Sequence, residues 1–375
     1  MDFNLSSQQK TIQRIAKEFR EKEIEPIAAR IERENKMPAD MIVKMAKTGL
    51  LGITAPKKYG GSAAGNLSYL LAQEEIGYAG SACFLLLHEN NGVSATIERF
   101  GTEEQKEKYI RMLCTGQAIG TTAFTEPGTG SDPKAIATTA TPDGDYYLLN
   151  GTKRFITSGN HNGPGIFYAK DETGRVSAFL VDKNMEGYSV SKPWDLMGLG
   201  GDEVVDVYLH NVRIPKGNLL GPKSDGMSIL YWATGIGSRL TNAAVTVGMA
   251  QAALDESIKY AKERVVRGQP IAAMQSIQWL LAEMASKVEA ARWFTYRCGF
   301  LADQGTFIRK EASMAKLFVG HTGVEVADMA LQVHGAYGYT KDFKIERIYR
   351  AMKFIELVEG TTEMQRSIVA KALTS

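Results

Sequence analysis

The sequence predicts an α+β protein in which a central β domain lies between two helical domains. Three stretches of different composition lead to this fold class. Residues 1–120 repeat apolar side chains at three- and four-residue steps, which is typical of helices. Residues 121–226 are rich in Thr, Val, Tyr, Gly and Pro and contain short strand-like runs. Residues 227–375 return to the helical pattern, so the order of the domains is helix, strand, helix.

Capping signals mark the helices of the N-terminal helical domain. Ser6 and Gln9 fit a capping box before the apolar stripe of Ile12–Phe19, because each side chain can satisfy a backbone N–H at the helix start. Thr102 and Gln105 repeat this pattern before another helix. We expect further helices over residues 66–79 and 81–100.

The central domain is predicted to be an antiparallel β-barrel or sandwich. Its strand-like runs are Tyr146–Leu149, Lys153–Thr157, Val176–Val181 and Val204–Leu209. Asn150-Gly151 separates the first two runs and predicts a hairpin, because a two-residue turn of this kind needs positive φ. The connections are too short for the crossovers that parallel strands require.

The C-terminal domain is predicted to be a helical bundle. Two long helices are expected over residues 227–264 and 271–302, and Gly268 and Pro270 break the chain between them. Two or three helices follow, with a loop marked by Gly335 and Gly338.

Composition excludes several classes of protein. The 375 residues carry 44 Lys and Arg against 42 Asp and Glu, and a net charge of +2 argues against a nucleic-acid-binding face. The longest apolar runs, such as Phe84–Leu87, are far shorter than the roughly 18 residues of a membrane span. Cys83, Cys114 and Cys298 form neither a metal pattern nor a disulfide framework, so we expect no metal and a cytoplasmic location.

Two short motifs suggest sites that their context does not support. Gly198-Leu199-Gly200-Gly201 lacks the third glycine of a dinucleotide-binding fingerprint, and a strand follows where a helix is required. His88-Glu89 begins like a zinc-protease helix, but no second His follows at the right spacing. We therefore interpret the first as a loop and expect no metal site at the second.

Three segments combine residues suited to a cofactor or to catalysis. Residues 125–132, TEPGTGSD, form a rigid loop with backbone amides and hydroxyls that can face a ligand. Residues 153–159, KRFITSG, place Phe155 and Thr157 on one face of a strand, which suits a flat heteroaromatic ring. In residues 358–365, VEGTTEMQ, an apolar setting would raise the pKa of Glu359, as a general base needs. Taken singly, each segment also fits an ordinary loop, strand or helix cap.

Together, TEPGTGSD, RFITSG, the loop QVHGAYGY at residues 332–339 and VEGTTEMQ resemble the acyl-CoA dehydrogenase family in order and spacing. The resemblance covers nearly the whole chain. It implies an N-terminal helical domain, a central β domain and a C-terminal four-helix bundle, assembled as a homotetramer with one FAD per subunit. It also implies an acyl-CoA substrate and an electron-transferring flavoprotein as the electron acceptor.

The resemblance assigns the role of catalytic base to Glu359. This carboxylate would remove the α-proton of an acyl-CoA thioester while the β-hydride passes to the flavin, which yields a 2-enoyl-CoA. Some family members carry the base on the long helix after the β domain, where this chain has Ser238. Because a serine there cannot act as the base, the assignment of Glu359 is strengthened.

The resemblance also implies the residues that contact the cofactor and the substrate. Around the flavin ring it places Phe124, Thr125, Ser131, Phe155 and Thr157. From a neighbouring subunit it brings Arg264, Gln275, Gln332 and Gly335 to the pyrophosphate and adenosine of FAD. Further FAD contacts are Thr361 and Glu363, and the expected substrate contacts are Ser131, Arg239 and Gly360.

The acyl group is less well defined. In the family, the pocket floor comes partly from the helix that holds residues 86–91. His88 and Asn91 are more polar than a pocket for long straight chains requires, which favours short, branched or cyclic acyl groups, including cyclohexanecarboxyl. The alternative is that these two side chains make hydrogen bonds outside the pocket. The competing functions are an acyl-CoA oxidase or other oxygen-using flavoenzyme of the same fold, and a non-catalytic protein that keeps the fold.

Overall fold

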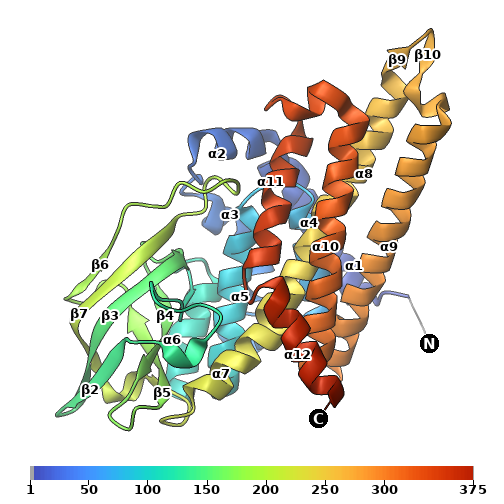
Figure 1. Ribbon diagram of the computed structural model, residues 1–375. Coiled ribbons are helices and arrows are strands. Elements are labelled where there is room, and N and C mark those ends of the chain that lie inside the picture. Colours follow the sequence, from blue (N-terminus) through green and yellow to red (C-terminus); the bar gives the residue numbers. More distant parts are fainter. Residues whose placement is uncertain (1–3, 375) are drawn as a thin grey trace.

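A computed structural model of the chain describes residues 4–374, apart from the side chain of Ile236. It has helices at both ends of the chain and a β domain between them (Figure 1). The β domain lies to one side, and the long helices α8 (Arg239–Glu263), α9 (Gln275–Asp303) and α10 (Arg309–His334) run beside one another away from it. The predicted fold class is therefore confirmed.

The N-terminal part of the chain is helical, as predicted. Its helices are α1 (Ser7–Phe19), α2 (Ala28–Glu34), α3 (Met41–Lys47), α4 (Gly65–Gly77), α5 (Cys83–Phe100) and α6 (Glu103–Cys114). Both predicted capping boxes are present: Ser6 and Gln9 exchange hydrogen bonds before α1, and Thr102 and Gln105 do so before α6.

The sheet of the β domain is mixed. Its strands are β1 (Thr121–Ala123), β2 (Thr139–Asp143), β3 (Tyr146–Thr157), β4 (Pro164–Lys170), β5 (Val176–Asp182), β6 (Tyr188–Val190), β7 (Val204–Pro215) and β8 (Leu219–Leu220). They pair in the order β6-β7-β3-β2-β4-β5-β8, and β1 pairs with β4. The prediction of an all-antiparallel sheet was wrong at two pairs, because β1 and β2 each run parallel to β4. Neither parallel pair joins strands that are consecutive in the sequence, so no helical crossover is needed.

The predicted hairpin at Asn150-Gly151 does not exist. Both residues lie inside β3, where the pairing with β7 shifts its register between Leu149 and Gly151. A Cβ at Gly151 would come within 2.4 Å of the Thr138 hydroxyl, so close packing explains this glycine. The tight turn falls instead between β2 and β3, at Gly144, whose φ is +55°.

The C-terminal part is helical, but its first long helix is interrupted. Helix α7 (Gly226–Trp232) passes into α8 through a π-helical turn at Ala233–Ser238. After α8, the short strands β9 (Val265–Val266) and β10 (Gln269–Pro270) form a hairpin that leads to α9. Helices α10, α11 (Lys344–Leu357) and α12 (Thr362–Thr374) complete the chain. No helix within residues 4–374 combines the length and the apolar character needed to cross a membrane.

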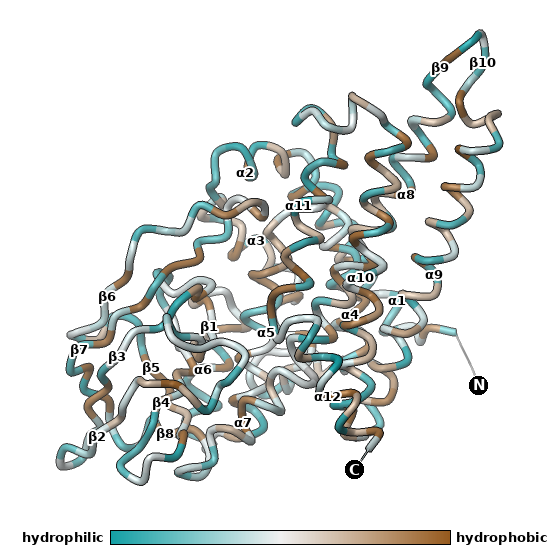
Figure 2. Tube along the Cα trace, in the orientation of Figure 1, coloured by the Kyte–Doolittle hydropathy of each residue, from teal (hydrophilic) through white to brown (hydrophobic). Residues whose placement is uncertain are grey.

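Helix α5 connects the two kinds of structure. One apolar core packs its first turns against α1, α3, α8 and α11, and a second core packs its later turns against α6 and the strands β4 and β5. Figure 2 shows hydrophobic colour along α5 and hydrophilic colour on the outlying α2. The π-helical turn at Ala233–Ser238 also contacts α5, so this turn lies at the junction of the domains.

Candidate active site

Glu359 lies in a strained turn between α11 and α12. Its backbone is left-handed, with φ of +54°, and Gly360 follows with φ of +88°. Left-handed backbone is uncommon for a residue other than glycine, and such residues cluster at functional sites. The Gln365 side chain donates hydrogen bonds to the carbonyls of Glu359 (3.2 Å) and Gly360 (2.7 Å), and Lys316 Nζ donates to the Gly360 carbonyl (2.6 Å). These bonds hold the turn in place.

The surroundings of Glu359 favour its neutral form. Burial raises the pKa of its carboxyl group, and the cations of Arg239 and Lys316 together with a hydrogen bond from Ser238 offset only part of that rise. Ser238 is the residue at the family's alternative base position, and the structure brings it to the carboxyl of Glu359. A carboxyl with a raised pKa is suited to accept a proton near neutral pH.

Several buried polar atoms near Glu359 have no partner among the described residues. Arg239 is 5% exposed, and its Nε and Nη1 atoms make no hydrogen bond there. Burial lowers the pKa of Arg239 to about 10, against the opposing effect of Glu359. The hydroxyl of Tyr168 on β4 is also buried without a partner, and burial, with the charge of Glu359, raises the pKa of Tyr168. Buried polar groups are normally satisfied, so this cluster points to a ligand.

Phe155 lies on a bulge of β3. Its φ is +58°, and the pairing with β7 shifts between Lys153 and Ile156. Simple alternation, from which we predicted that Phe155 and Thr157 share a face, is interrupted here because the buried Lys153 and Ile156 are three residues apart. The Phe155 ring is 54% exposed and lies 5.3 Å from the ring of Trp194. The bulge therefore turns an aromatic ring outward.

The loop that begins at Phe124 lies against this bulge. The backbone N–H of Arg154 donates to the Thr125 carbonyl at 2.9 Å. Phe124, Thr125 and Thr157 are half-buried and Ser131 is exposed, so these two segments offer three hydroxyls beside the exposed ring of Phe155. Hydroxyl donors beside an exposed ring fit the polar edge and flat face of a flavin, so the residues present fit FAD.

The other predicted cofactor contacts fall into two places. Thr361 and Glu363 lie beside Glu359 at the start of α12, where Glu363 is exposed. Arg264, Gln275, Gln332 and Gly335 are exposed at the far ends of α8 and α10 and at the start of α9. In Figure 1 these helix ends lie on the side of the molecule that carries the β9–β10 hairpin, well away from the β domain. One chain does not bring these four residues to Phe155.

The helix α5 presents a second carboxyl group, Glu89, which the sequence analysis considered only as part of a zinc-protease motif. Glu89 is 8% exposed, and burial together with the charges of Glu359 and Asp202 holds its pKa well above the ordinary range, while Lys183 acts in the opposite direction. It makes no hydrogen bond or ion pair within residues 4–374. The available signal was a Glu two residues after the apolar run Phe84–Leu87.

The two polar residues used to predict the acyl group behave differently. Asn91 accepts a hydrogen bond from the Ile53 amide and donates to the carbonyls of Leu50 and Leu87, so its polarity serves the fold. For Asn91 the alternative interpretation, hydrogen bonding away from the pocket, is the one the structure supports. His88 Nδ1 lies 3.5 Å from the Tyr69 hydroxyl, and burial lowers the pKa of His88 to about 4, so this imidazole is neutral.

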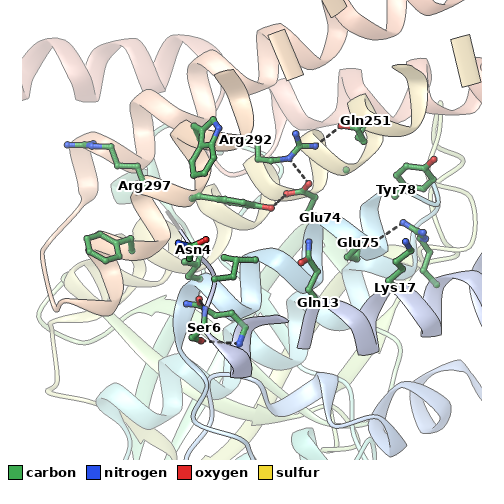
Figure 3. Close-up of a pocket in the computed structure, with 18 of the residues that line it drawn as sticks. Asn4, Ser6, Gln13, Lys17, Glu74, Glu75, Tyr78, Gln251, Arg292 and Arg297 are labelled. Carbon is green, nitrogen blue, oxygen red and sulfur yellow. Dashed lines mark hydrogen bonds and ion pairs between the residues drawn. The ribbon is translucent and has the colours of Figure 1, made fainter. Parts of the chain in front are cut away.

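A large groove lies elsewhere on the molecule. It has a volume of about 1300 Å³ and runs between α1, α4, α8 and α9 (Figure 3). Its buried carboxylate, Glu74, is paired with Arg292 at 3.0 Å and accepts a hydrogen bond from Tyr296 at 2.7 Å. None of the predicted site residues lines it, so we do not place the active site there.

Comparison with known proteins identifies the family. Models of the acyl-CoA dehydrogenase N-terminal, middle and C-terminal domains match residues 6–117, 121–212 and 225–374. The chain is 41% identical to a 3-(aryl)acrylate reductase of Clostridium sporogenes, over 98% of this chain and 99% of that one. It is 40% identical, over 98% of both chains, to a subunit of the caffeyl-CoA reductase–Etf complex of Acetobacterium woodii.

A solved structure agrees with this result. An acyl-CoA dehydrogenase from Bacillus anthracis, complexed with FAD, is 32% identical and superposes with a TM-score of 0.95, covering 99% of this chain and 67% of that one. The chain therefore belongs to the acyl-CoA dehydrogenase family. Members of this family are FAD-dependent oxidoreductases that act on a CH–CH bond, and this protein is an enzyme of that class.

Proposed function

We propose that the protein interconverts an acyl-CoA thioester and its 2-enoyl-CoA, with Glu359 as the base. The observation that carries this proposal is the half-buried Glu359, whose carboxyl lies beside Ser238 and Arg239. The Nε and Nη1 atoms of Arg239 make no hydrogen bond among the described residues. The raised pKa of Glu359 matches it to proton transfer from a weakly acidic α C–H bond. Its backbone N–H, presented by the left-handed turn, is the proposed donor to the thioester oxygen. Bound FAD supplies the hydride acceptor.

The proposed substrate is a short, branched or cyclic acyl-CoA, with cyclohexanecarboxyl-CoA among the candidates. Asn91 no longer supports this choice, but other polar groups do. The Tyr69 hydroxyl lies between His88 on α5 and Thr241 on α8, at 3.5 Å and 3.2 Å, and Thr241 follows Ser238 by one helical turn. Glu89 adds a carboxyl on the same helix as His88. The arylacrylate and caffeyl-CoA enzymes named above act on ring-bearing groups, which supports a cyclic one.

We infer that a complete FAD site needs more than one chain. Phe124, Thr125, Ser131, Phe155, Thr157, Thr361 and Glu363 are the proposed contacts from one subunit. The separated residues Arg264, Gln275, Gln332 and Gly335 are the proposed contacts from its neighbour, in a homotetramer. Large exposed aromatic side chains on α9 and α10, such as Trp279, Phe300 and Phe318, are 65%, 50% and 41% exposed and would be covered by such an assembly.

The proposed electron partner is an electron-transferring flavoprotein, since the Acetobacterium woodii relative belongs to a complex that contains one. The proposed location is the cytoplasm, and the buried free thiols of Cys83, Cys114 and Cys298 fit a reducing compartment. The proposed contacts to the substrate are Ser131, Arg239 and Gly360.

A panel of acyl-CoA thioesters tests the reaction. Each would be mixed anaerobically with the FAD-loaded protein, and bleaching of the flavin absorbance would be recorded. We expect short, branched or cyclic saturated thioesters to bleach it and the Glu359→Gln variant to respond far more slowly. If no saturated thioester bleaches the flavin of the wild-type protein, the proposed reaction is wrong. Rapid reoxidation of the bleached flavin by oxygen would favour the oxidase alternative.

A further inference from the structure

A buried ion pair connects the two segments that carry the proposed flavin contacts. Lys153 on β3 has no exposed surface, and Glu126, in the loop 125–132, is 6% exposed. Lys153 Nζ lies 2.8 Å from Oε1 of Glu126. The same ammonium donates to the carbonyls of Phe124 (3.3 Å) and Tyr168 (2.6 Å). One lysine therefore ties β3 to the start of the flavin loop and to β4.

The Glu126 carboxylate is also bound by the chain that leads into β2, through both of its oxygens. The backbone N–H groups of Ala137 and Thr138 donate to it at 2.5 Å and 3.0 Å, and the Thr138 hydroxyl donates as well. Burial disfavours the ionised form, but Lys153 and these hydrogen bonds outweigh burial and hold the pKa of Glu126 below its ordinary value. The carboxylate is therefore charged and fully engaged.

The next residue along β3 makes a second ion pair, with a neighbouring strand. The Arg154 guanidinium, partly exposed, pairs with the buried Asp206 of β7 at 2.8 Å, and its backbone N–H donates to Thr125. Lys153 is held by Glu126 and Arg154 by Asp206. Both residues directly precede Phe155, whose backbone is left-handed. The bulge that exposes the Phe155 ring therefore begins at two anchored residues.

Stability alone does not account for such a pair. Two buried charges lose hydration, and well-packed apolar side chains of similar volume are often as stable or more so. Resting on the proposed FAD contacts, we propose that Lys153 and Glu126 are positioning residues of the flavin site. They hold the loop 125–132 in register with the Phe155 bulge, so that hydroxyls from one segment and the aromatic ring from the other meet the same face of the cofactor.

Three variants separate positioning from stability: Lys153→Met, Glu126→Gln and the double variant. Each apoprotein would be measured for thermal unfolding, and its FAD dissociation constant would be taken from the quenching of flavin fluorescence. Each single variant leaves a buried charge unpaired, so it should unfold at a lower temperature. The double variant should regain most of that loss. All three should bind FAD about 10- to 100-fold more weakly, because charged hydrogen bonds that fix the loop are gone.

Asp171→Asn is the matched control. Asp171 is another buried carboxylate of the β domain, 5% exposed, and it accepts hydrogen bonds from Ser177 and Ser224, neither of which belongs to the flavin loop. This variant should lose stability and keep wild-type affinity for FAD. Recovery of wild-type FAD affinity in the double variant would overturn the proposal, and so would its failure to fold, since the pair would then serve stability. A wild-type apoprotein that does not bind FAD would instead contradict the proposed function.

Discussion

At the scale of single residues, Glu359 combines a left-handed backbone, which costs stability, with a carboxyl of raised pKa, which suits it to act as a base. Replacing it with Gln keeps its size and removes the base. We expect the rate of flavin reduction by a good substrate to fall by about 10²–10⁴ or more. The nearest alternative position holds Ser238, which cannot take over as the base. Binding of substrate should change little, because the backbone N–H of residue 359 remains. Stopped-flow reduction and a binding titration measure the two effects separately.

The matched control for this variant is Glu104→Gln, which changes an exposed carboxylate in the first turn of α6. It should lower the reduction rate far less. Near wild-type reduction by Glu359→Gln would contradict the assignment, and Glu89 would then be the next carboxyl group to replace.

The raised pKa of Glu359 predicts how rate and stability depend on pH. The wild-type reduction rate should rise with pH through this pKa, because only the ionised carboxylate accepts a proton, and the rise should be absent in Glu359→Gln. The folded-state pKa lies above the unfolded one, so the fold loses stability as pH increases through it. Above that pH the apoprotein of Glu359→Gln should therefore unfold at a higher temperature than the wild type. The exposed Glu104→Gln should show no such gain.

At the scale of elements, the turn between α11 and α12 is held by hydrogen bonds from the side chains of Lys316 and Gln365. Lys316 on α10 is 2% exposed and donates to the carbonyls of Gly360 (2.6 Å) and Glu356 (3.4 Å). Lys316→Met should let the turn move and should reduce kcat/KM about tenfold or more, because a charged hydrogen bond to the turn is lost. FAD content should stay at the wild-type level. Steady-state kinetics with absorbance of the bound flavin measure both quantities.

Lys353→Met is the control for that prediction. Lys353 is exposed on α11, and its ammonium pairs with the side chain of Glu356 rather than with the turn's backbone. If both variants lose the same activity, a general effect of charge near the site explains the loss, and Lys316 has no special role.

The elements also show which features the sequence could predict. The capping boxes before α1 and α6 were predicted correctly, because each depends on two residues three positions apart. The hairpin at Asn150-Gly151 was wrong, because the packing of Gly151 against Thr138 is a contact between neighbouring strands, which the dipeptide itself does not record. The π-helical turn at Ala233–Ser238 was not predicted, since one shifted hydrogen-bond register leaves the helical apolar pattern intact.

In the candidate site, too, local motifs could be predicted from the sequence and tertiary contacts could not. Its three motifs are local, so their residues could be named from the sequence. The unpaired atoms of Arg239, the position of Glu89 near Glu359 and the ion pair between Lys153 and Glu126 depend on tertiary packing, which no local pattern records. The individual roles of the predicted contacts and the domain boundaries at residues 120 and 226 remain predictions.

At the scale of the whole molecule, the proposed FAD contacts lie apart, so the proposed cofactor site requires assembly of more than one chain. The strand β3, which carries Phe155, and the ends of α8 and α10 lie in different regions of one chain (Figure 1). A single FAD cannot meet both sets unless a second chain contributes one of them. Loss of assembly should therefore also mean loss of cofactor.

Trp279→Glu tests this coupling. Trp279 is 65% exposed on α9 and follows Gln275 by four residues, so both lie on one helix face. A carboxylate there should be disfavoured if a neighbouring chain covers this face, because burying an unpaired charge is costly. We expect light scattering to detect smaller species, and flavin absorbance per chain to fall in the same fractions.

Tyr208→Glu, on the exposed side of β7, is the control and should keep both assembly and FAD. A Trp279→Glu monomer that retains one FAD per chain would show that a single subunit completes the site, and the contacts proposed for Arg264, Gln275, Gln332 and Gly335 would have to be withdrawn.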